Sequence, residues 1–166
     1  MTAYLGLGSN MGDRRAHLQA AVDSLRSRGI GVSGSSSVYE TDPVGEVPDQ
    51  RAFLNAAIRV TVGLEPEQLL AVAKAVELEL GRDPRAPRHG PRPVDVDLLL
   101  IDGLTLERPD LRVPHRDLLE RRFVLVPLLE LDFSLRHADG TRLSDALAAL
   151  APDEQRVSWA GPPLSF

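Results

Sequence analysis

The order of apolar and polar residues predicts two long helices set among short strands in the first part of the chain. Apolar residues recurring at helical spacing predict helices over residues 13–28 and 66–80. Short apolar runs bounded by turn-forming residues predict strands over residues 3–7, 32–39, 53–62 and 94–101. The resulting order, strand–helix–strand–strand–helix–strand, is the split βαβ pattern of an α+β ferredoxin-like sandwich.

Residues that start and stop helices lie where the predicted helices need them. Asp13 is suited to cap the first helix, and Gly29 follows its last residue. Pro66 suits the first position of the second helix, and Gly81 ends it. The helix boundaries therefore rest on capping residues as well as on the spacing of apolar positions.

The rest of the chain is predicted to hold loops and shorter elements. Residues 41–51 and 82–93 are rich in proline and are expected to form exposed loops. We expect short elements near residues 123–131 and a helix near residues 143–150. The tail after Pro152 is expected to be peripheral.

Composition narrows the class of protein. A chain of 166 residues that is 43% hydrophobic and 26% charged is expected to form a single domain over residues 1–166. The absence of cysteine excludes disulfides, thiolate catalysis and cysteine-ligated metal sites. A net charge of −5 argues against nucleic-acid binding, and no apolar run is long enough to span a membrane. We expect a cytoplasmic protein without a signal peptide, acting as a monomer or weak dimer.

Four arginines are clustered in one short segment of a chain whose net charge is negative. Arg82, Arg85, Arg88 and Arg92 fall within eleven residues and are opposed only by Asp83. Guanidinium groups bind phosphate oxygens in a bidentate manner, so a loop of this kind could fold over a polyphosphate. A solvated surface loop, or pairing of the arginines with nearby carboxylates, explains the same pattern without a ligand.

Asp95 and Asp97 are the sharpest chemical signal. Because they are two residues apart on a predicted strand, their side chains leave the same face, about 6–7 Å apart. Val94, Val96 and Leu98 occupy the opposite face. Two like charges on a largely buried strand are costly unless a cation lies between them, and Mg²⁺ with phosphate oxygens satisfies both. The alternative is a strand whose first half leaves the core, with carboxylates solvated or paired to arginine.

Other candidate positions are weak signals when each is taken alone. The glycine-rich residues 6–12 lack the lysine and the spacing of a phosphate-binding loop, and alone they indicate a strand-to-helix turn. His115 alone is typical of a structural histidine, and Asn55 of an ordinary sheet residue. Phe53 and Phe123 are candidates for stacking a planar ligand, because aromatic residues make up only 4% of the chain.

Together these motifs resemble one family, the 6-hydroxymethyl-7,8-dihydropterin pyrophosphokinases of folate biosynthesis. The resemblance runs from Tyr4 to about Leu131 and includes the string Gly-Pro-Arg-Pro-Val-Asp-Val-Asp at residues 90–97. The other motifs lie at residues 7–10, 37–41, 53–56, 81–82, 113–115 and 121–128. The resemblance implies a ferredoxin-like fold and transfer of pyrophosphate from ATP to the pterin hydroxymethyl group, with release of AMP.

The resemblance also implies roles for residues at matching positions. It implies that Asp95 and Asp97 bind two Mg²⁺ ions that bridge the phosphates of the co-substrate ATP. The implied catalytic residues are Asp95, Asp97, Arg82 and Arg92. The implied nucleotide-binding residues are Glu77, Arg82, Arg85, Arg88, Arg92, Leu98, His115 and Arg121. The implied pterin-binding residues are Thr41, Pro43, Val44, Phe53, Asn55 and Phe123.

The chain departs from the family pattern at three positions. Pro84 stands where an arginine is common, so either Arg85 takes over that contact or the contact is missing. His89 stands where a tryptophan is common, which weakens the case for an aromatic lid over the substrate. Arg116 stands where a proline or tyrosine is common, and the resemblance leaves its role open.

Two other functions would use some of the same residues. A two-metal nucleotidyltransferase on the same sandwich also needs two strand carboxylates, but it needs no pterin pocket. Dihydropterin binding in the presence of MgATP therefore distinguishes it from a pyrophosphokinase. A non-catalytic ligand-binding module predicts instead that Asp95 and Asp97 can be neutralised without loss of function.

Overall fold

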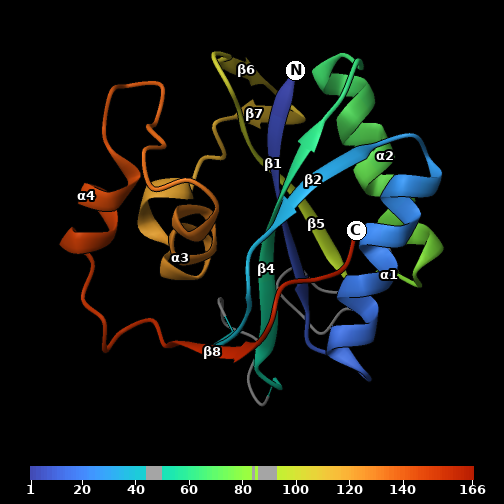
Figure 1. Cartoon of the computed structure of the whole chain (residues 1–166), viewed down its shortest axis with the longest axis horizontal. Helices are drawn as coiled ribbons and strands as arrows, with labels where there is room; N and C mark the ends of the chain where they lie inside the picture. Colours follow the sequence, from blue (N-terminus) through green and yellow to red (C-terminus); the bar gives the residue numbers. More distant parts are fainter. Residues whose placement is uncertain (44–49, 84, 86–92) are drawn as a thin grey trace.

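An antiparallel sheet with helices on both of its faces forms the centre of the fold (Figure 1). The computed structural model describes residues 1–43, 50–83, 85 and 93–166. The six-stranded sheet has the order β5-β1-β4-β3-β8, and β2 also pairs with β4. These strands pair antiparallel throughout. Their bounds are β1 (Thr2–Ser9), β2 (Gly31–Ser35), β3 (Val38–Thr41), β4 (Phe53–Thr61), β5 (Asp95–Ile101) and β8 (Val157–Gly161).

Helices form a layer on each side of the sheet. On one side lie α1 (Arg14–Ser27) and α2 (Pro66–Glu79), and on the other lie α3 (Arg122–Leu131) and α4 (Leu143–Ala149) (Figure 1). A hairpin and a short 3₁₀ helix connect β5 to α3. These connecting elements are β6 (Leu106–Arg108), β7 (Leu111–Val113) and the 3₁₀ helix Leu118–Glu120.

Capping residues set the ends of the two long helices as their sequence predicts. The Asp13 side chain accepts a hydrogen bond of 3.1 Å from the Ala16 backbone N–H. Pro66 is the first residue of α2. Gly29 and Gly81 follow the two helices with φ of +86° and +101°, a left-handed conformation that other residues adopt only with strain. Both helix predictions are therefore confirmed to within a residue or two.

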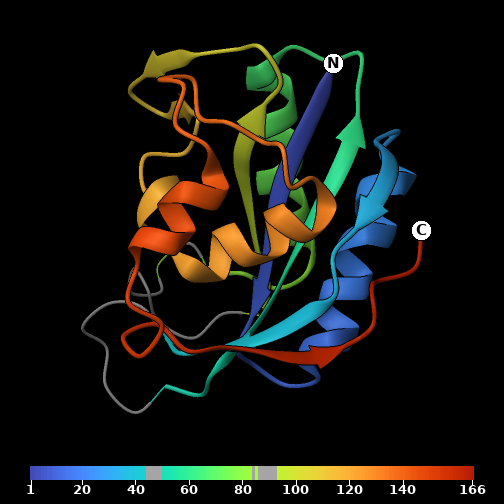
Figure 2. The same ribbon diagram turned by 60° about the vertical axis from the view of Figure 1, so that its left-hand side comes forward.

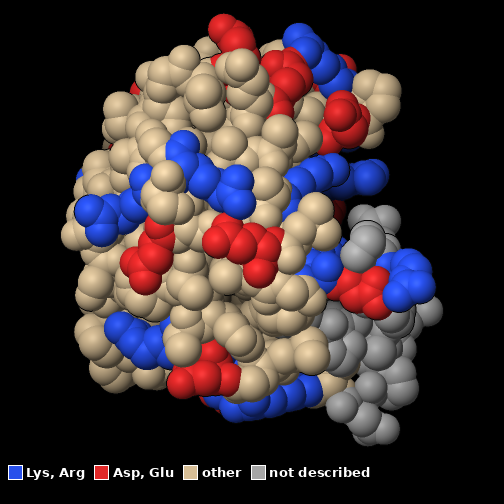
Figure 3. All heavy atoms as spheres, turned by 90° about the vertical axis from the view of Figure 1, so that its right-hand side faces the viewer, with Lys and Arg blue, Asp and Glu red and all other residues tan. Residues whose placement is uncertain are grey.

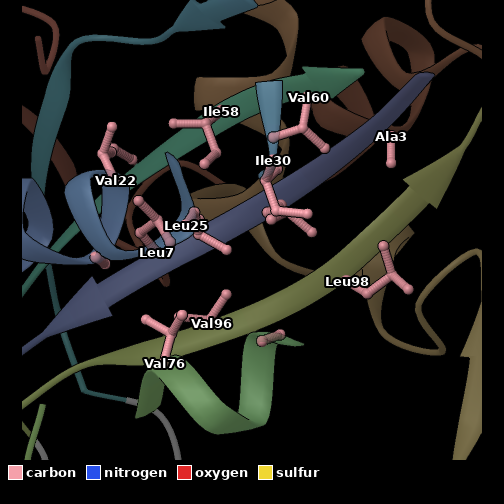
Figure 4. Close-up of a cluster of buried hydrophobic side chains, with 14 of the residues drawn as sticks. Ala3, Leu7, Val22, Leu25, Ile30, Ile58, Val60, Val76, Val96 and Leu98 are labelled. Atoms are coloured by element: carbon pink, nitrogen blue, oxygen red, sulfur yellow. The ribbon is translucent and has the colours of Figure 1, made fainter. Parts of the chain in front are cut away.

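Each helical layer packs on the sheet through its own hydrophobic cluster. The larger cluster joins the sheet to α1 and α2, and includes Val22, Leu25 and Val96 (Figure 4). The second cluster joins the opposite face to α3, and includes Leu99 and Leu125. In the first part of β5, Val96 and Leu98 therefore point into the larger cluster and Leu99 into the second, as alternation along a strand predicts.

The strand expected over residues 32–39 is two strands in the structure. Ser36, between β2 and β3, is fully buried, and its hydroxyl accepts a hydrogen bond of 2.9 Å from the Ala57 backbone N–H. The same hydroxyl donates to the Ser37 carbonyl at 2.7 Å. The Ser36 hydroxyl thus takes the place of a backbone carbonyl as the acceptor for Ala57 on the neighbouring strand, so the regular ladder is interrupted here.

The C-terminal tail is not peripheral, which corrects the expectation from the sequence. Residues after Pro152 cross from the α3–α4 layer, form β8 on the edge of the sheet beside β3, and end against α1 (Figures 1 and 2). Leu164 is 2% exposed in the larger cluster. The Arg15 guanidinium donates to the Pro162 carbonyl at 2.9 Å. The strand β8 is only five residues long, and the sequence shows no clear alternation there, so the long-range pairing was not apparent.

The remaining expectations concern the loops and the surface. Most of the predicted loops at residues 41–51 and 82–93 lie outside the described residues. No helix within the described part of the chain is long and apolar enough to cross a membrane. On the face that carries α1 and α2, acidic and basic side chains are interspersed (Figure 3).

Candidate active site

Asp95 and Asp97 lie on the face of β5 that is turned toward α3. Both alternate with buried neighbours and share their face with Leu99, which packs in the cluster that includes α3 residues. The predicted shared face of the two carboxylates is thus confirmed. In the neighbouring strand β1, Gly8 pairs with Asp95 and Gly6 pairs with Asp97. The carboxylates therefore stand beside two positions that carry no side chain.

The two glycines form the floor of a hollow between the sheet and α3, which we call the inner pocket. Across β1, Gly8 also pairs with Asn55 of β4, and Gly6 pairs with Ala57. Small residues in the middle of this face leave room between the carboxylates on β5 and the amide on β4. Residues of the inner pocket include Gly6, Gly8, Thr41, Phe53, Asn55, Asp95, Asp97, Arg121 and Phe123.

Asn55 is oriented by a buried hydroxyl. Its Nδ2 donates a hydrogen bond of 2.7 Å to Thr41 Oγ1, and Thr41 is only 1% exposed. Phe53 lies two residues earlier on the same face of β4, as alternation along a strand predicts. An aromatic ring beside an amide that both donates and accepts suits a flat ligand with a polar rim.

The start of α3 forms the wall opposite the sheet. Arg121 precedes the first residue of α3, and Phe123 is its second residue. The Arg121 guanidinium lies 5.5 Å from the centre of the Phe123 ring, within the range of a cation–π contact. Its Nη2 lies 3.0 Å from Asp117 Oδ2. Phe123 is half-buried and is not among the described residues of either hydrophobic cluster. Its ring therefore belongs to the pocket wall.

A second hollow, which we call the outer groove, runs along the edge strand β5 between α2 and the β6–β7 hairpin. Several of its side chains are cationic, which favours an anionic ligand. Residues of the outer groove include Lys74, Glu77, Arg82, Asp95, Asp97, Leu98, Arg112, His115, Arg116 and Arg121.

Arg82 links two of the carboxylates that line this groove. Its Nη1 lies 3.1 Å from Glu77 Oε2 and 2.7 Å from Asp95 Oδ1. Glu77 also accepts a hydrogen bond of 2.9 Å from the Val96 backbone N–H. Burial raises the pKa of Glu77 to about 7, with a smaller contribution from the Asp95 carboxylate. Pairing of an arginine with Asp95, one of the alternatives open from the sequence, is therefore present in the structure.

His115 presents a neutral donor to the outer groove. Burial lowers the pKa of its imidazole from 6.5, and the nearby charge of Arg121 lowers it further. Its Nδ1 accepts a hydrogen bond of 3.2 Å from the Asp117 backbone N–H, so the ring proton is assigned to Nε2. The backbone N–H of His115 donates to the Leu99 carbonyl at 2.8 Å, which ties the residue to β5.

Asp95, Asp97 and Arg121 line both the inner pocket and the outer groove. Two carboxylates and one guanidinium therefore stand where ligands in the two hollows would meet. Such a junction provides metal-binding oxygens and a phosphate-binding cation in one place. This arrangement suits a reaction between a planar molecule and a polyphosphate.

The structure does not bring every predicted site residue to this junction. The Arg85 side chain is 90% exposed, its Nε lies 3.5 Å from Asp83 Oδ1, and it lines neither hollow. Pro43 lines a separate hollow beside the inner pocket. Val44, Arg88 and Arg92 lie outside the described residues, as do Pro84 and His89.

Asp117 contributes to the site without having been singled out from the sequence, and Gly6 and Gly8, which alone indicated only a strand-to-helix turn, contribute as its floor. Asp117 contacts Arg121 through its side chain and His115 through its backbone N–H. Its spacing of four residues from Arg121 was an available signal, although such pairs are common on protein surfaces. The role of the glycines as a floor depends on strand pairing, which the sequence does not reveal.

The side chains at the junction provide some, but not all, of the ligands that a divalent cation needs. Asp95 and Asp97 provide carboxylate oxygens, the ligands that Mg²⁺ prefers. Within the described residues no group of three or more acidic or histidine side chains is placed to hold a metal. Because Mg²⁺ usually takes one or two carboxylates and completes its shell with water and phosphate oxygens, two carboxylates are compatible with it.

Comparisons with known proteins identify the family. Residues 4–133 match the model of the 7,8-dihydro-6-hydroxymethylpterin-pyrophosphokinase family. A 2-amino-4-hydroxy-6-hydroxymethyldihydropteridine pyrophosphokinase of Bacillus subtilis is 46% identical over 130 residues, covering 78% of this chain and 77% of that protein. The enzyme of the same name from Methylorubrum extorquens is 45% identical over 151 residues, covering 90% of this chain and 94% of that protein.

Solved structures show the same fold in longer chains. A crystal structure of wild-type Plasmodium falciparum HPPK-DHPS with pteroate aligns with a TM-score of 0.66 at 13% identity, over 89% of this chain. The aligned part is 44% of that chain, so this protein spans less than half of its length. Given the family match and the identity to curated relatives, the chain belongs to the 7,8-dihydro-6-hydroxymethylpterin-pyrophosphokinase family.

Proposed function

We propose that the inner pocket and the outer groove together transfer pyrophosphate from ATP to 6-hydroxymethyl-7,8-dihydropterin. The products are the pterin diphosphate and AMP, as expected for a step of folate biosynthesis. The observation that carries this proposal is the sharing of Asp95, Asp97 and Arg121 by both hollows. A transfer reaction needs its two substrates to meet at one place, and the described geometry supports that place.

In this proposal the pterin lies in the inner pocket. Phe53 and Phe123 stand on opposite walls, one on β4 and the other on α3, and would stack on the two faces of the ring. Asn55, held by Thr41, would hydrogen-bond the ring edge. The hydroxymethyl group would then point toward the carboxylates at the junction.

The triphosphate of ATP is proposed to lie in the outer groove. Arg82 and Arg121 would bind phosphate oxygens, and His115 would donate from Nε2 without adding charge. The pterin hydroxyl oxygen would attack the β-phosphorus in line. The bond between that phosphorus and the oxygen bridging to the α-phosphate would break, AMP would leave with the bridging oxygen, and the hydroxyl proton would pass to solvent water. The chain's contribution is positioning and charge neutralisation.

Asp95 and Asp97 are the residues proposed to hold Mg²⁺, with two ions expected. When bound, Mg²⁺ would neutralise the charge of the phosphate oxygens. Asp95 Oδ1 is also the atom that Arg82 contacts, so an ion held by this oxygen would compete with the ion pair. Release of Arg82 from Asp95 would free its guanidinium for a phosphate oxygen.

We further propose that the fold is ferredoxin-like and that residues 1–166 act as one domain. The strand order β5-β1-β4, followed by β2 and β3 as one interrupted strand, supports this topology. The helices α1 and α2 connect β1 to β2 and β4 to β5 on one face, as the split βαβ pattern requires.

A single reaction tests the proposed function. The protein is mixed with ATP, Mg²⁺ and hydroxymethyl-dihydropterin, and the nucleotide product is identified by chromatography. AMP formed only when all three are present is the expected result. Formation of ADP would exclude pyrophosphate transfer, and release of inorganic pyrophosphate with a nucleotide joined to the acceptor would indicate a nucleotidyltransferase.

A further inference from the structure

The C-terminal segment contacts the wall that the start of α3 forms. Gln155 Oε1 accepts a hydrogen bond of 2.7 Å from the Arg122 backbone N–H, and Gln155 Nε2 donates to the Glu120 carbonyl at 3.0 Å. One side-chain amide thus holds the main chain on both sides of Arg121. The side chain of Arg121, the N-cap residue of α3, makes no capping bond. Gln155 therefore supplies, from a distant part of the chain, an acceptor that the first turn of the helix needs.

The same segment is also fixed to the opposite wall of the inner pocket. Arg156 Nε donates a hydrogen bond of 3.0 Å to Asp42 Oδ1, beside Thr41 at the end of β3. The Arg122 guanidinium donates to the Gln155 carbonyl at 2.6 Å. Residues 155 and 156 thus join the start of α3 to the end of β3, and both line a hollow that adjoins the inner pocket.

We propose that Gln155 is a positioning residue for the transfer reaction. By fixing the main chain on both sides of Arg121, it sets where the guanidinium stands between the inner pocket and the outer groove. Gln155 lies beyond residues 4–133, the part of the chain that the family model matches. This role rests on the proposed function, because the placement of Arg121 affects turnover only if the two substrates meet at the junction.

The first test replaces the amide while keeping the length of the side chain. Gln155→Met removes both hydrogen bonds, and kcat/KM for the pterin, measured by AMP release, is expected to fall by about tenfold. Gln155→Glu keeps an acceptor for the Arg122 N–H and is expected to retain more activity than the Met variant. Circular dichroism establishes that both variants are folded. Wild-type activity in Gln155→Met would overturn the proposal.

A double-mutant cycle with Arg121→Ala separates positioning from a general loss of structure. If Gln155 acts through Arg121, then Gln155→Met should lower activity by less than about twofold once Arg121 is already Ala. The affinity for the pterin, measured in the presence of a nonhydrolysable ATP analogue, allows the same comparison of the two backgrounds without turnover. An equal loss in both backgrounds would show that Gln155 acts independently of Arg121.

Gln19 provides a matched control. Its Nε2 donates to the Ser165 carbonyl at 2.8 Å and its Oε1 accepts from the Ser165 N–H at 2.9 Å, so it anchors the same C-terminal segment on α1. Gln19→Met should remain within about twofold of wild type. A loss matching that of Gln155→Met would indicate general anchoring of the tail and contradict the proposal. Absence of AMP formation by the wild-type protein would instead refute the proposed function, and this role with it.

Discussion

Gly8 faces Asn55 across the β1–β4 ladder, and a Cβ atom at Gly8 would lie only 2.7 Å from Asn55 Oδ1. That distance is too short for two heavy atoms that are not bonded to each other. Asn55 has little freedom to move away, because its Nδ2 is held by Thr41 at 2.7 Å. The glycine is therefore required by the amide on the neighbouring strand.

Gly8→Ala should weaken pterin binding, because the added methyl group collides with the Asn55 side chain. The added methyl displaces Asn55 from its bond to Thr41, at a cost of about 1–2 kcal/mol in pterin affinity. Calorimetry with the pterin and a nonhydrolysable ATP analogue measures the effect. Gly63→Ala is the control, because a Cβ at Gly63 meets no atom within 4 Å. Equal pterin affinity in both variants would contradict the proposed role of Asn55.

The sequence predicted those parts of the fold that depend on neighbouring residues. Both long helices follow from the spacing of apolar residues and from caps such as Asp13, which lie within a few residues of what they stabilise. The break between β2 and β3 could not be predicted in this way. It depends on a hydrogen bond between Ser36 and Ala57, which are 21 residues apart.

In the candidate site, too, features that depend on neighbouring residues could be predicted and features that depend on distant residues could not. Alternation along one strand was enough to place Asp95 and Asp97 on one face. The bond from Arg82 to Asp95 and the contacts of Gln155 with α3 join distant segments, so no local pattern indicates them. The roles of individual residues came from the resemblance to the family and remain predictions.

Asp97→Asn should abolish most AMP formation and leave the metal-free fold intact. Loss of one carboxylate from the proposed magnesium site is expected to lower kcat by about 100-fold or more, as when a preorganised charge contact is removed at other active sites. The fold should tolerate the change, because Asn keeps the shape of the side chain. AMP release gives the activity, and urea unfolding gives the stability.

Asp102→Asn is the control for this substitution. Asp102 directly follows β5, at the opposite end from Asp95, and is exposed. Its neutralisation changes the net charge by the same amount without touching the junction. Activity close to wild type in Asp97→Asn would exclude the proposed metal role, whereas equal losses in both variants would indicate an effect of overall charge.

His115 should make the protein less stable in acid. Burial, and then the charge of Arg121, lower the pKa of the folded imidazole below the 6.5 of an unfolded chain. The unfolded state therefore takes up a proton more readily, so the contribution to stability is present above pH 6.5 and is lost as the pH falls through the folded pKa. The free energy of unfolding should fall below pH 6.5 more steeply in wild type than in His115→Asn.

Direct titration by NMR checks the cause of this shift. The His115 imidazole should titrate below 6.5 in the ligand-free protein, and its pKa should rise in Arg121→Ala, where the second cause is removed. Burial remains in that variant, so the rise should be partial. This account would be refuted if the free energy of unfolding fell equally steeply with pH in wild type and in His115→Asn. It would also be refuted if the pKa of His115 were unchanged in Arg121→Ala.

Phe123→Ala should weaken pterin binding by about 1–3 kcal/mol, through lost stacking and lost apolar burial. Phe123 lines the inner pocket but not the outer groove, so nucleotide affinity measured without pterin should change little. Titrations of each ligand, with and without the other, provide the two affinities.

Phe133→Ala is the matched control, because Phe133 follows the other end of α3 and is 72% exposed. Removing that ring changes the same type of residue near the same helix without altering the inner pocket. Pterin affinity should therefore fall in Phe123→Ala and stay level in Phe133→Ala. If Phe123→Ala unfolds the protein, or weakens pterin and nucleotide equally, Phe123 stabilises the fold and its ring is not a wall of the pterin pocket.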